Sequence, residues 1–238
     1  CELQGKFDKA LDYLSTGRTA LAGNENCPEM ARLYGLMGWV HMRRGNFEEA
    51  LALCGQGLYI LADLPKDEAL ARDEAELYNT MGCTYQAHGS YVQAAEFYQR
   101  RAQILEQIGD LQGLASAYNN LAATYWGRGD YVATSDYLQR TLEISQKLGY
   151  SNATAFCYNN LGILSYQAGE YAQAIEYYRQ SMRLRQRIGD TWGMGQTYIN
   201  LGEVYHAQKD YSLARQYLGA AIETLASLEA KSELVEAY

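Results

Sequence analysis

Proline is the residue whose scarcity says most about this chain. It occurs twice in 238 residues, as Pro28 and Pro65. Because proline lacks a backbone N–H and interrupts helices, this scarcity leaves room for many uninterrupted helices. Apolar residues make up 48% of the chain, so a long helical protein can still bury a substantial core.

Positive charge and long apolar runs are also in short supply. The 20 lysines and arginines are outnumbered by 28 aspartates and glutamates, which gives a net charge of −8. Nucleic acids and anionic membranes require a basic surface, so neither is an expected partner. No apolar run approaches the roughly 18 residues of a membrane helix, and the opening CELQGKFDKA does not resemble a signal peptide. We therefore expect a cytoplasmic protein.

Cysteine and histidine do not form a pattern that would bind a metal. The five cysteines are widely spaced, none of them in a CxxC pair, and the three histidines are scattered. This arrangement favours free thiols in a reducing compartment over disulfides or a zinc site. Catalytic motifs are missing as well, since the chain has no GxxxxGKS/T, HExxH or GxSxG sequence. We expect no enzyme activity, and no cofactor or metal, in this chain.

A repeat with a period of about 40 residues is what the sequence does contain. One aromatic series follows short turns at gaps of 40, 44, 40, 40 and 40 residues: Phe7, Phe47, Tyr91, Tyr131, Tyr171 and Tyr211. A second series keeps the same phase: Tyr34, Tyr78, Tyr118, Tyr158, Tyr198 and Tyr238. Two aromatic series in register along the whole chain predict a repeat architecture.

Each unit is predicted to form two helices. In one unit, apolar or small residues recur with the i, i+3, i+4, i+7 spacing of a helix face: Tyr118, Leu121, Ala122 and Tyr125. A Gly-Asp turn at 129–130 ends this helix, and a second helix follows from Tyr131. A single pair cannot cover its own apolar faces, so neighbouring pairs must stack on one continuous core. The predicted fold is therefore all-α, an α-solenoid of antiparallel helix pairs.

The order of these residues resembles the tetratricopeptide repeat. Its signature of large, Leu-Gly, Tyr, Gly, Tyr, Ala and aromatic positions is matched best by Tyr78, Met81, Gly82, Tyr85, Gly89, Tyr91, Ala94 and Tyr98. The resemblance covers nearly all of the chain and implies a right-handed superhelix. The long 40-residue units are similar to those of kinesin light chain, spindle-orientation adaptors and bacterial multidomain regulators. Ser165 and Lys209 depart from the signature, at a tyrosine and at a turn glycine.

The repeat phase divides the chain as follows. We expect a single array over 1–238, with a half-unit at 1–22 that includes a turn at residues 5–7. Repeats of about 28–66, 70–110, 111–150, 151–190 and 191–230 come next, and a further repeat starts at 231–238. Because the chain starts and stops in the middle of a unit, we expect it to be a fragment of a larger protein.

The resemblance implies that one flank of each first helix lines a concave groove. With about 100° of rotation per residue, that flank holds ten candidate site residues: Asn79, Asn119, Asn159, Asn120, Asn160, Asn200, Trp39, Gln86, Trp126 and Tyr166. Asparagine offers both donors and acceptors, so a row of amides can bind the backbone of an extended peptide. We expect the first three asparagines to face the groove. The next three, and the aromatics Trp126 and Tyr166, serve either the groove or packing between repeats.

These features favour a protein–protein interaction scaffold that binds a peptide or protein segment in the groove. Two alternatives stay open: a ligand-sensing arm of a bacterial cyclase, ATPase or transcription regulator, and a self-association module that forms a homo-oligomer. Arg32 alone is basic on this flank, so we expect no clamp for an acidic C-terminus. Three arginines, Arg179, Arg183 and Arg187, recur every four residues and form either a solvated stripe or a patch for an acidic partner.

Overall fold

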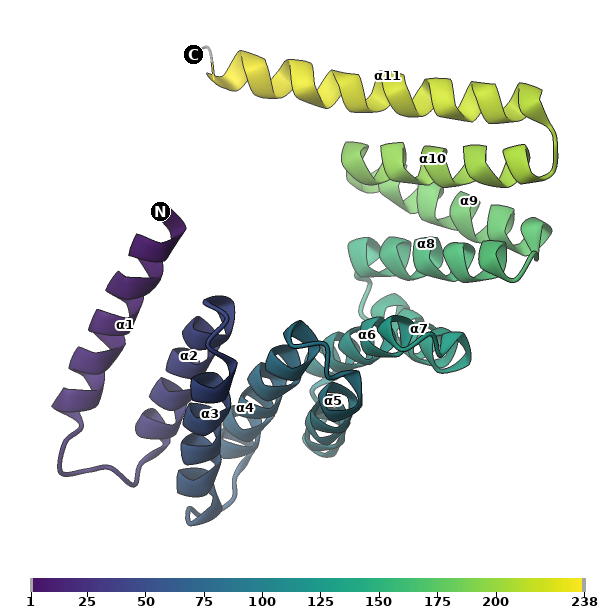
Figure 1. Ribbon diagram of the computed structural model, residues 1–238. Helices are drawn as coiled ribbons and strands as arrows, with labels where there is room; N and C mark the ends of the chain where they lie inside the picture. The colour runs from purple at the N-terminus through teal and green to yellow at the C-terminus, as the bar shows by residue number, and fades with distance from the viewer. Residues whose placement is uncertain (1, 237–238) are drawn as a thin grey trace. The chain divides into compact units, whose positions relative to one another are not determined.

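The computed structural model describes residues 2–236, and the side chains of residues 5–228 within that range. This described part contains eleven α-helices and no β-strand, which confirms the all-α prediction (Figure 1). Unit 1 (Cys1–Asp130) holds α1 (Glu2–Ala20), α2 (Pro28–Arg43), α3 (Phe47–Ala62), α4 (Glu68–Ala87), α5 (Tyr91–Gln107) and α6 (Leu111–Gly127). Unit 2 (Tyr131–Tyr238) holds α7 (Tyr131–Lys147), α8 (Ser151–Gln167), α9 (Tyr171–Ile188), α10 (Thr191–Ala207) and α11 (Tyr211–Glu236).

The helices pack in consecutive pairs within each unit. In unit 1, α2 packs on α3 and α4 on α5, while α2 also contacts α4. In unit 2, α8 packs on α9 and α10 on α11, and α8 contacts α10. This sequential stacking of helix pairs is the predicted α-solenoid packing. None of the helices in residues 2–236 is long and apolar enough to cross a membrane.

The aromatic series that defines the period marks where second helices begin. Five of its six members are the first residue of a helix: Phe47, Tyr91, Tyr131, Tyr171 and Tyr211. The sixth, Phe7, lies inside α1, which is unbroken, so the turn predicted at residues 5–7 is wrong. A single glycine costs only about 1 kcal/mol inside a helix, and Gly5 by itself does not force a turn. At the other end, α11 continues to Glu236, and Tyr238 lies outside the described residues.

A glycine of the first helix packs against a large side chain of the second helix in several pairs. An added Cβ at Gly82 would lie 2.6 Å from the ring of Tyr98, and one at Gly162 would lie 2.6 Å from the ring of Tyr178. Both rings are 1% exposed. The absence of a side chain on the first helix is therefore what lets each ring fit between the two helices.

The turn that ends each first helix has the same backbone geometry. Gly89 and Gly169 lie in the left-handed region, with φ of 82° and 78°. The next residue donates its N–H to the carbonyl five positions back, as from Ser90 to Tyr85 at 2.8 Å, which is the Schellman arrangement. Lys209 occupies the equivalent position in unit 2 with φ of 63°, so this departure from the signature retains the turn.

The strain at Lys209 gives a first prediction. A side chain in the left-handed region costs about 1–2 kcal/mol, partly offset because glycine has more conformational freedom in the unfolded chain. We expect Lys209→Gly to raise the free energy of unfolding by about 0.5–1 kcal/mol, measured by urea denaturation. The matched control is Gln208→Gly, at φ of −75°, which should lower it. A lower stability of Lys209→Gly would contradict the assignment of strain.

The glycine–tyrosine contact gives a second prediction. Gly162→Ala should lower the free energy of unfolding by about 2 kcal/mol, because the buried Tyr178 ring has no space into which it can move. Gly219→Ala, also within a helix of unit 2, meets no atom within 4 Å and should be neutral or stabilising. Equal effects of the two substitutions in thermal unfolding would show that helix propensity, not packing, decides the outcome.

Candidate functional site

The first helices α2 and α4 of unit 1 border a cleft of about 390 Å³. On its α2 side lie Leu36 and Trp39, which are 55% and 45% exposed. On its α4 side lie Asp73, Glu76 and Asn79. The cleft therefore combines two large exposed apolar side chains with an amide and two carboxylates, and it contains Trp39 and Asn79 from the predicted site.

The carboxylates bordering this cleft are held by arginines. Arg32 Nε donates to both oxygens of Asp73, at 2.9 and 2.8 Å. This hydrogen bond raises the pKa of Arg32 further above its ordinary value. Because Asp73 neutralises it, Arg32 does not offer a free positive charge to a terminal carboxylate.

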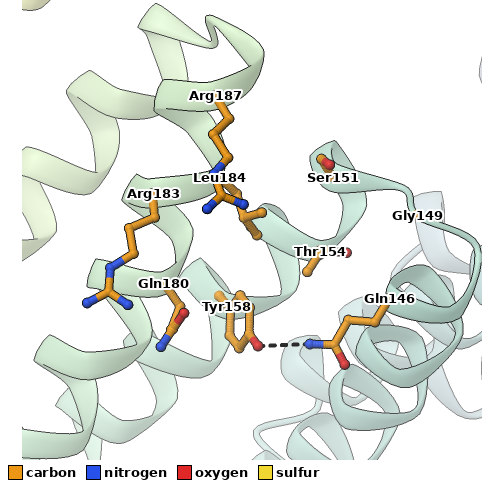
Figure 2. Close-up of a pocket in the computed structure, with 9 residues that line it drawn as sticks. All are labelled: Gln146, Gly149, Ser151, Thr154, Tyr158, Gln180, Arg183, Leu184 and Arg187. Carbon is orange, nitrogen blue, oxygen red and sulfur yellow. Dashed lines mark hydrogen bonds between the residues drawn. The ribbon is translucent and has the colours of Figure 1, made fainter.

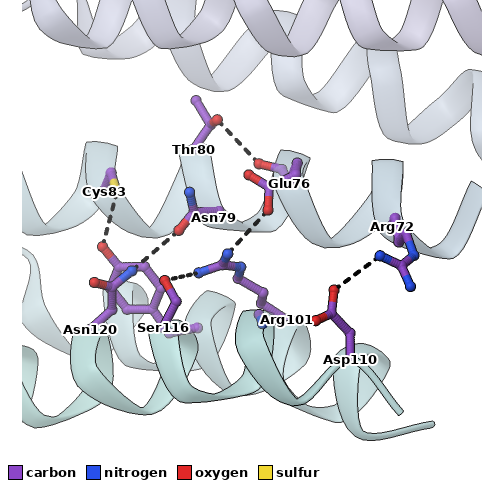
Figure 3. A network of polar contacts seen from close by, with 11 residues as sticks. Arg72, Glu76, Asn79, Thr80, Cys83, Arg101, Asp110, Ser116 and Asn120 are labelled. Atoms are coloured by element: carbon purple, nitrogen blue, oxygen red, sulfur yellow. Dashed lines mark hydrogen bonds and ion pairs between the residues drawn. The ribbon is translucent and has the colours of Figure 1, made fainter. Parts of the chain in front are cut away.

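A polar network beneath the cleft connects α4, α5 and α6 (Figure 3). Arg101 of α5 is 5% exposed; it donates to Glu76 Oε1 at 3.1 Å and to Ser116 Oγ at 3.3 Å. Beside it, Asn120 Nδ2 donates to Asn79 Oδ1 at 3.2 Å. The network fixes the orientation of Glu76 and Asn79. It leaves the Asn79 amide nitrogen without a protein partner among the described residues.

Unit 2 has the same amide pair, 41 residues apart in sequence. Asn200 Nδ2 donates to Asn159 Oδ1 at 3.1 Å, and the Thr197 hydroxyl donates to the same oxygen at 3.4 Å. Asn159 is only 8% exposed, so little of its amide is open to a partner. The two asparagine series predicted as separate rows therefore bond to each other, one from each neighbouring first helix.

The remaining predicted residues fall into two groups. Asn119 and Asn160 are half-buried on first helices, and Trp126 is 37% exposed. Gln86 and Tyr166 contribute to packing: Gln86 Oε1 accepts from the buried Tyr98 hydroxyl at 2.9 Å, and the Tyr166 ring lies 5.9 Å from that of Tyr171. Burial raises the pKa of the Tyr98 phenol, so this donor stays protonated.

The sequence analysis did not identify the two carboxylates of the cleft, Asp73 and Glu76. Their spacing from Thr80 is i, i+3, i+7, which places all three on one face of α4, and all three line the cleft. That spacing is the signal that could have identified them. The buried partner Arg101 had no such signal, because exposed arginines on second helices look the same in sequence.

The four described cysteines are free thiols: Cys27, Cys54, Cys83 and Cys157. Burial raises the pKa of both Cys54 and Cys157 to about 12, so neither forms a reactive thiolate near neutral pH. No group of three or more His, Cys, Asp or Glu side chains able to hold a metal occurs among the described residues.

Stacked helix pairs, close glycine contacts and left-handed turns define a helical-repeat protein. The chain belongs to the tetratricopeptide repeat family, since models of this repeat match residues 4–63, 113–187 and 165–227. Repeats of this family are typically non-catalytic scaffolds, which supports a general role in protein–protein interaction. No match was found among the curated proteins.

Several solved structures share the fold. BtubC (BKLC) from P. vanneervenii has a TM-score of 0.81 and 24% identity, covering 96% of this chain and 93% of that chain. The apo form of RapI has a TM-score of 0.70 and 14% identity, covering 95% and 94%. A proposed kinesin light chain from Podosopora anserina, with nearly identical TPR-like repeats, has a TM-score of 0.70 and 17% identity, covering 85% and 98%. At these identities the likeness establishes the fold.

The network beneath the cleft gives a third prediction. Glu76→Ala removes the carboxylate that pairs with the buried Arg101, so we expect the free energy of unfolding to fall by about 1–2 kcal/mol. Glu74→Ala is the matched control, because its partner Lys66 is 73% exposed and loses little. Urea denaturation of both variants measures the difference. If Glu74→Ala lowers the free energy of unfolding as much as Glu76→Ala does, the burial of Arg101 does not increase the contribution of its ion pair to stability.

Proposed function

We propose that this chain is a protein-interaction scaffold whose unit 1 binds an extended protein segment across the cleft between α2 and α4. The observation that carries the proposal is the exposure of Leu36 and Trp39 beside the oriented amide of Asn79. Large apolar side chains that remain exposed together, rimmed by polar groups, mark interaction sites. Tryptophan in particular is enriched among the residues that dominate binding energy.

The side chains of the cleft suit two kinds of contact. Leu36 and Trp39 would bury an apolar side chain of the partner, while the free amide nitrogen of Asn79 would donate to a backbone carbonyl. Neighbouring helices pack at about 8–10 Å and an extended chain advances about 3.3 Å per residue, so each first helix meets roughly every third partner residue. A single amide contact contributes only about 1 kcal/mol, so affinity requires several contacts together.

The other predicted residues take two roles in this proposal. Asn119 and Trp126 on α6 extend the contacting surface within unit 1. Asn120, which bonds to Asn79, positions the amide that the partner meets. In unit 2, Asn159 and Asn200 bond to each other, and we assign them to the alignment of α8 with α10.

The charges of the cleft limit the partner's chemistry. Arg32 is neutralised by Asp73, and Glu76 is 64% exposed at its side chain. A partner with an acidic terminus would therefore meet the Glu76 carboxylate within the cleft, while the exposed Arg43 lies over the Trp39 ring, with its guanidinium carbon 5.7 Å from the ring centroid. We expect binding to be independent of a free C-terminal carboxylate, and to favour neutral or basic segments.

Peptides selected from a random displayed library test this proposal. We expect Trp39→Ala to weaken the selected peptides at least about tenfold, and Asn79→Ala about fivefold, in line with one lost amide contact. The control is Tyr59→Ala, which removes another exposed aromatic of unit 1, at 73% exposure, on the second helix α3. Isothermal titration measures the affinities. Peptides that bind wild type and Trp39→Ala equally would place the binding surface elsewhere.

A further inference from the structure

Positive charge is concentrated on one helix of this acidic chain. Helix α9 contains four arginines and one glutamate, a net charge of +3, whereas the whole chain carries −8. The flanking α7 has two acidic and two basic residues and is neutral, and α8 has no charged residue. The span from α7 to α9 (residues 131–188), which includes Glu170 between α8 and α9, therefore carries a net charge of +2, and the rest of the chain carries −10.

The arginines of α9 have different surroundings. Arg185 is 5% exposed, and its Nε lies 3.8 Å from Asp190, so it belongs to the packing of α9. Arg179, Arg183 and Arg187 form an exposed stripe at four-residue spacing. No acidic side chain in the described part of the chain forms an ion pair with these three.

Two arginines of the stripe line a pocket of about 350 Å³ between α7, α8 and α9. Figure 2 shows Arg183 and Arg187 on α9, with Tyr158 and Gln146 on the opposite side. Gln146 Nε2 donates to the Tyr158 hydroxyl at 2.9 Å, which holds both side chains at the rim. Thr154 also lines the pocket, and its hydroxyl is held by the Tyr150 carbonyl at 2.9 Å, to which it donates, and by Ser145 Oγ at 3.1 Å.

No carboxylate is among the residues that line this pocket in the described structure. The nearest acidic residues in sequence are Glu143, three residues before Gln146, and Asp190, which follows Arg187 by three residues and lies 3.8 Å from Arg185 Nε. On α9 itself, Glu176 accepts from Gln180 at 2.7 Å, about two turns before Arg183. The lining therefore presents two guanidinium groups together with amides and hydroxyls. This combination of donors suits an oxyanion, because guanidinium pairs with carboxylate or phosphate through charge-assisted hydrogen bonds.

The helix dipole does not account for the stripe. A cation stabilises a helix C-terminus only within the last turn, where Arg187 and Arg185 lie. Arg179 and Arg183 lie earlier in α9 and receive little from that effect. Arg179 and Arg183 are exposed and have no acidic partner, so they have no evident role in folding. Arg183 lines the pocket between α7, α8 and α9.

We propose that this pocket binds an oxyanionic side chain, a carboxylate or a phosphoryl group, presented by an acidic protein segment. Arg183 and Arg187 lie one helical turn apart, about 6 Å along α9, so two anionic groups at a similar spacing engage both. The negative charge of the rest of the chain repels long polyanions, which favours a short acidic segment over nucleic acid. This site is separate from the cleft of unit 1, and the two proposals stand or fall independently.

Fluorescence anisotropy with labelled peptides tests the proposal on the full 238-residue chain. The probes are a tetraglutamate peptide, a peptide of equal length with two phosphoserines, and a neutral tetraglutamine peptide. We expect at least one acidic probe to bind roughly tenfold more tightly than the neutral one, and to weaken as salt rises from about 50 to 150 mM. Preference for glutamate or phosphoserine identifies the carboxylate or the phosphoryl group as the ligand.

A matched pair of double variants separates this site from general charge. Arg183→Gln/Arg187→Gln should weaken the acidic peptide at least about tenfold, whereas Arg18→Gln/Arg215→Gln, with the same loss of charge at other exposed positions, should change it less than about twofold. Melting followed by circular dichroism should change little, and by the same amount in both, because all four side chains are exposed and each double variant removes one last-turn arginine, Arg187 or Arg18. Equal weakening by the two double variants overturns the proposal. It is also overturned by equal binding of the neutral peptide, or by tighter binding of a single-stranded oligonucleotide.

Discussion

The structure depends on one contact that recurs inside its helix pairs, a glycine of the first helix against a large side chain of the second. Gly82 faces Tyr98, Gly162 faces Tyr178, and Gly202 faces Leu218, each at a distance that no side chain on the glycine would allow. The two rings are almost completely buried as a result. Close pairing of the helices is accompanied by stacking of consecutive pairs, in which first helices contact each other, α2 with α4 and α8 with α10.

In this stacked arrangement the first helices have two roles: they bond to each other, and they form an exposed surface. Where neighbouring first helices meet, their amides bond to each other, from Asn120 to Asn79 in unit 1 and from Asn200 to Asn159 in unit 2. Beyond this line of amides the side chains are exposed, and in unit 1 they include Leu36 and Trp39. The residues that align the repeats therefore lie next to the residues that form the exposed surface, on the same helices. This arrangement explains how a regular scaffold can carry an irregular, partner-specific surface.

Periodicity alone predicted most of the fold, because packing within a repeat is local in sequence. The aromatic series marks the start of every second helix from α3 onward, and the spacing between glycine and aromatic residues can be recognised in the sequence. Contacts between repeats were harder to predict. That Asn79 and Asn120 form a hydrogen bond, and that Arg101 and Arg185 are buried while Arg183 is exposed, depends on rotations of neighbouring helices. A shift of one residue turns a side chain by about 100° around its helix and decides whether it makes such a contact. The repeat period does not predict this orientation.

The central claim is that a partner segment lies across the first helices of unit 1, over Leu36 and Trp39, and next to Asn79. Chemical-shift mapping of the labelled chain with a selected peptide tests this claim most directly. The account predicts that the largest shifts occur at the indole of Trp39, the methyl groups of Leu36 and the amide of Asn79, with little change on α3 and α5. Shifts confined to those second helices, with the Trp39 indole unaffected, would contradict it.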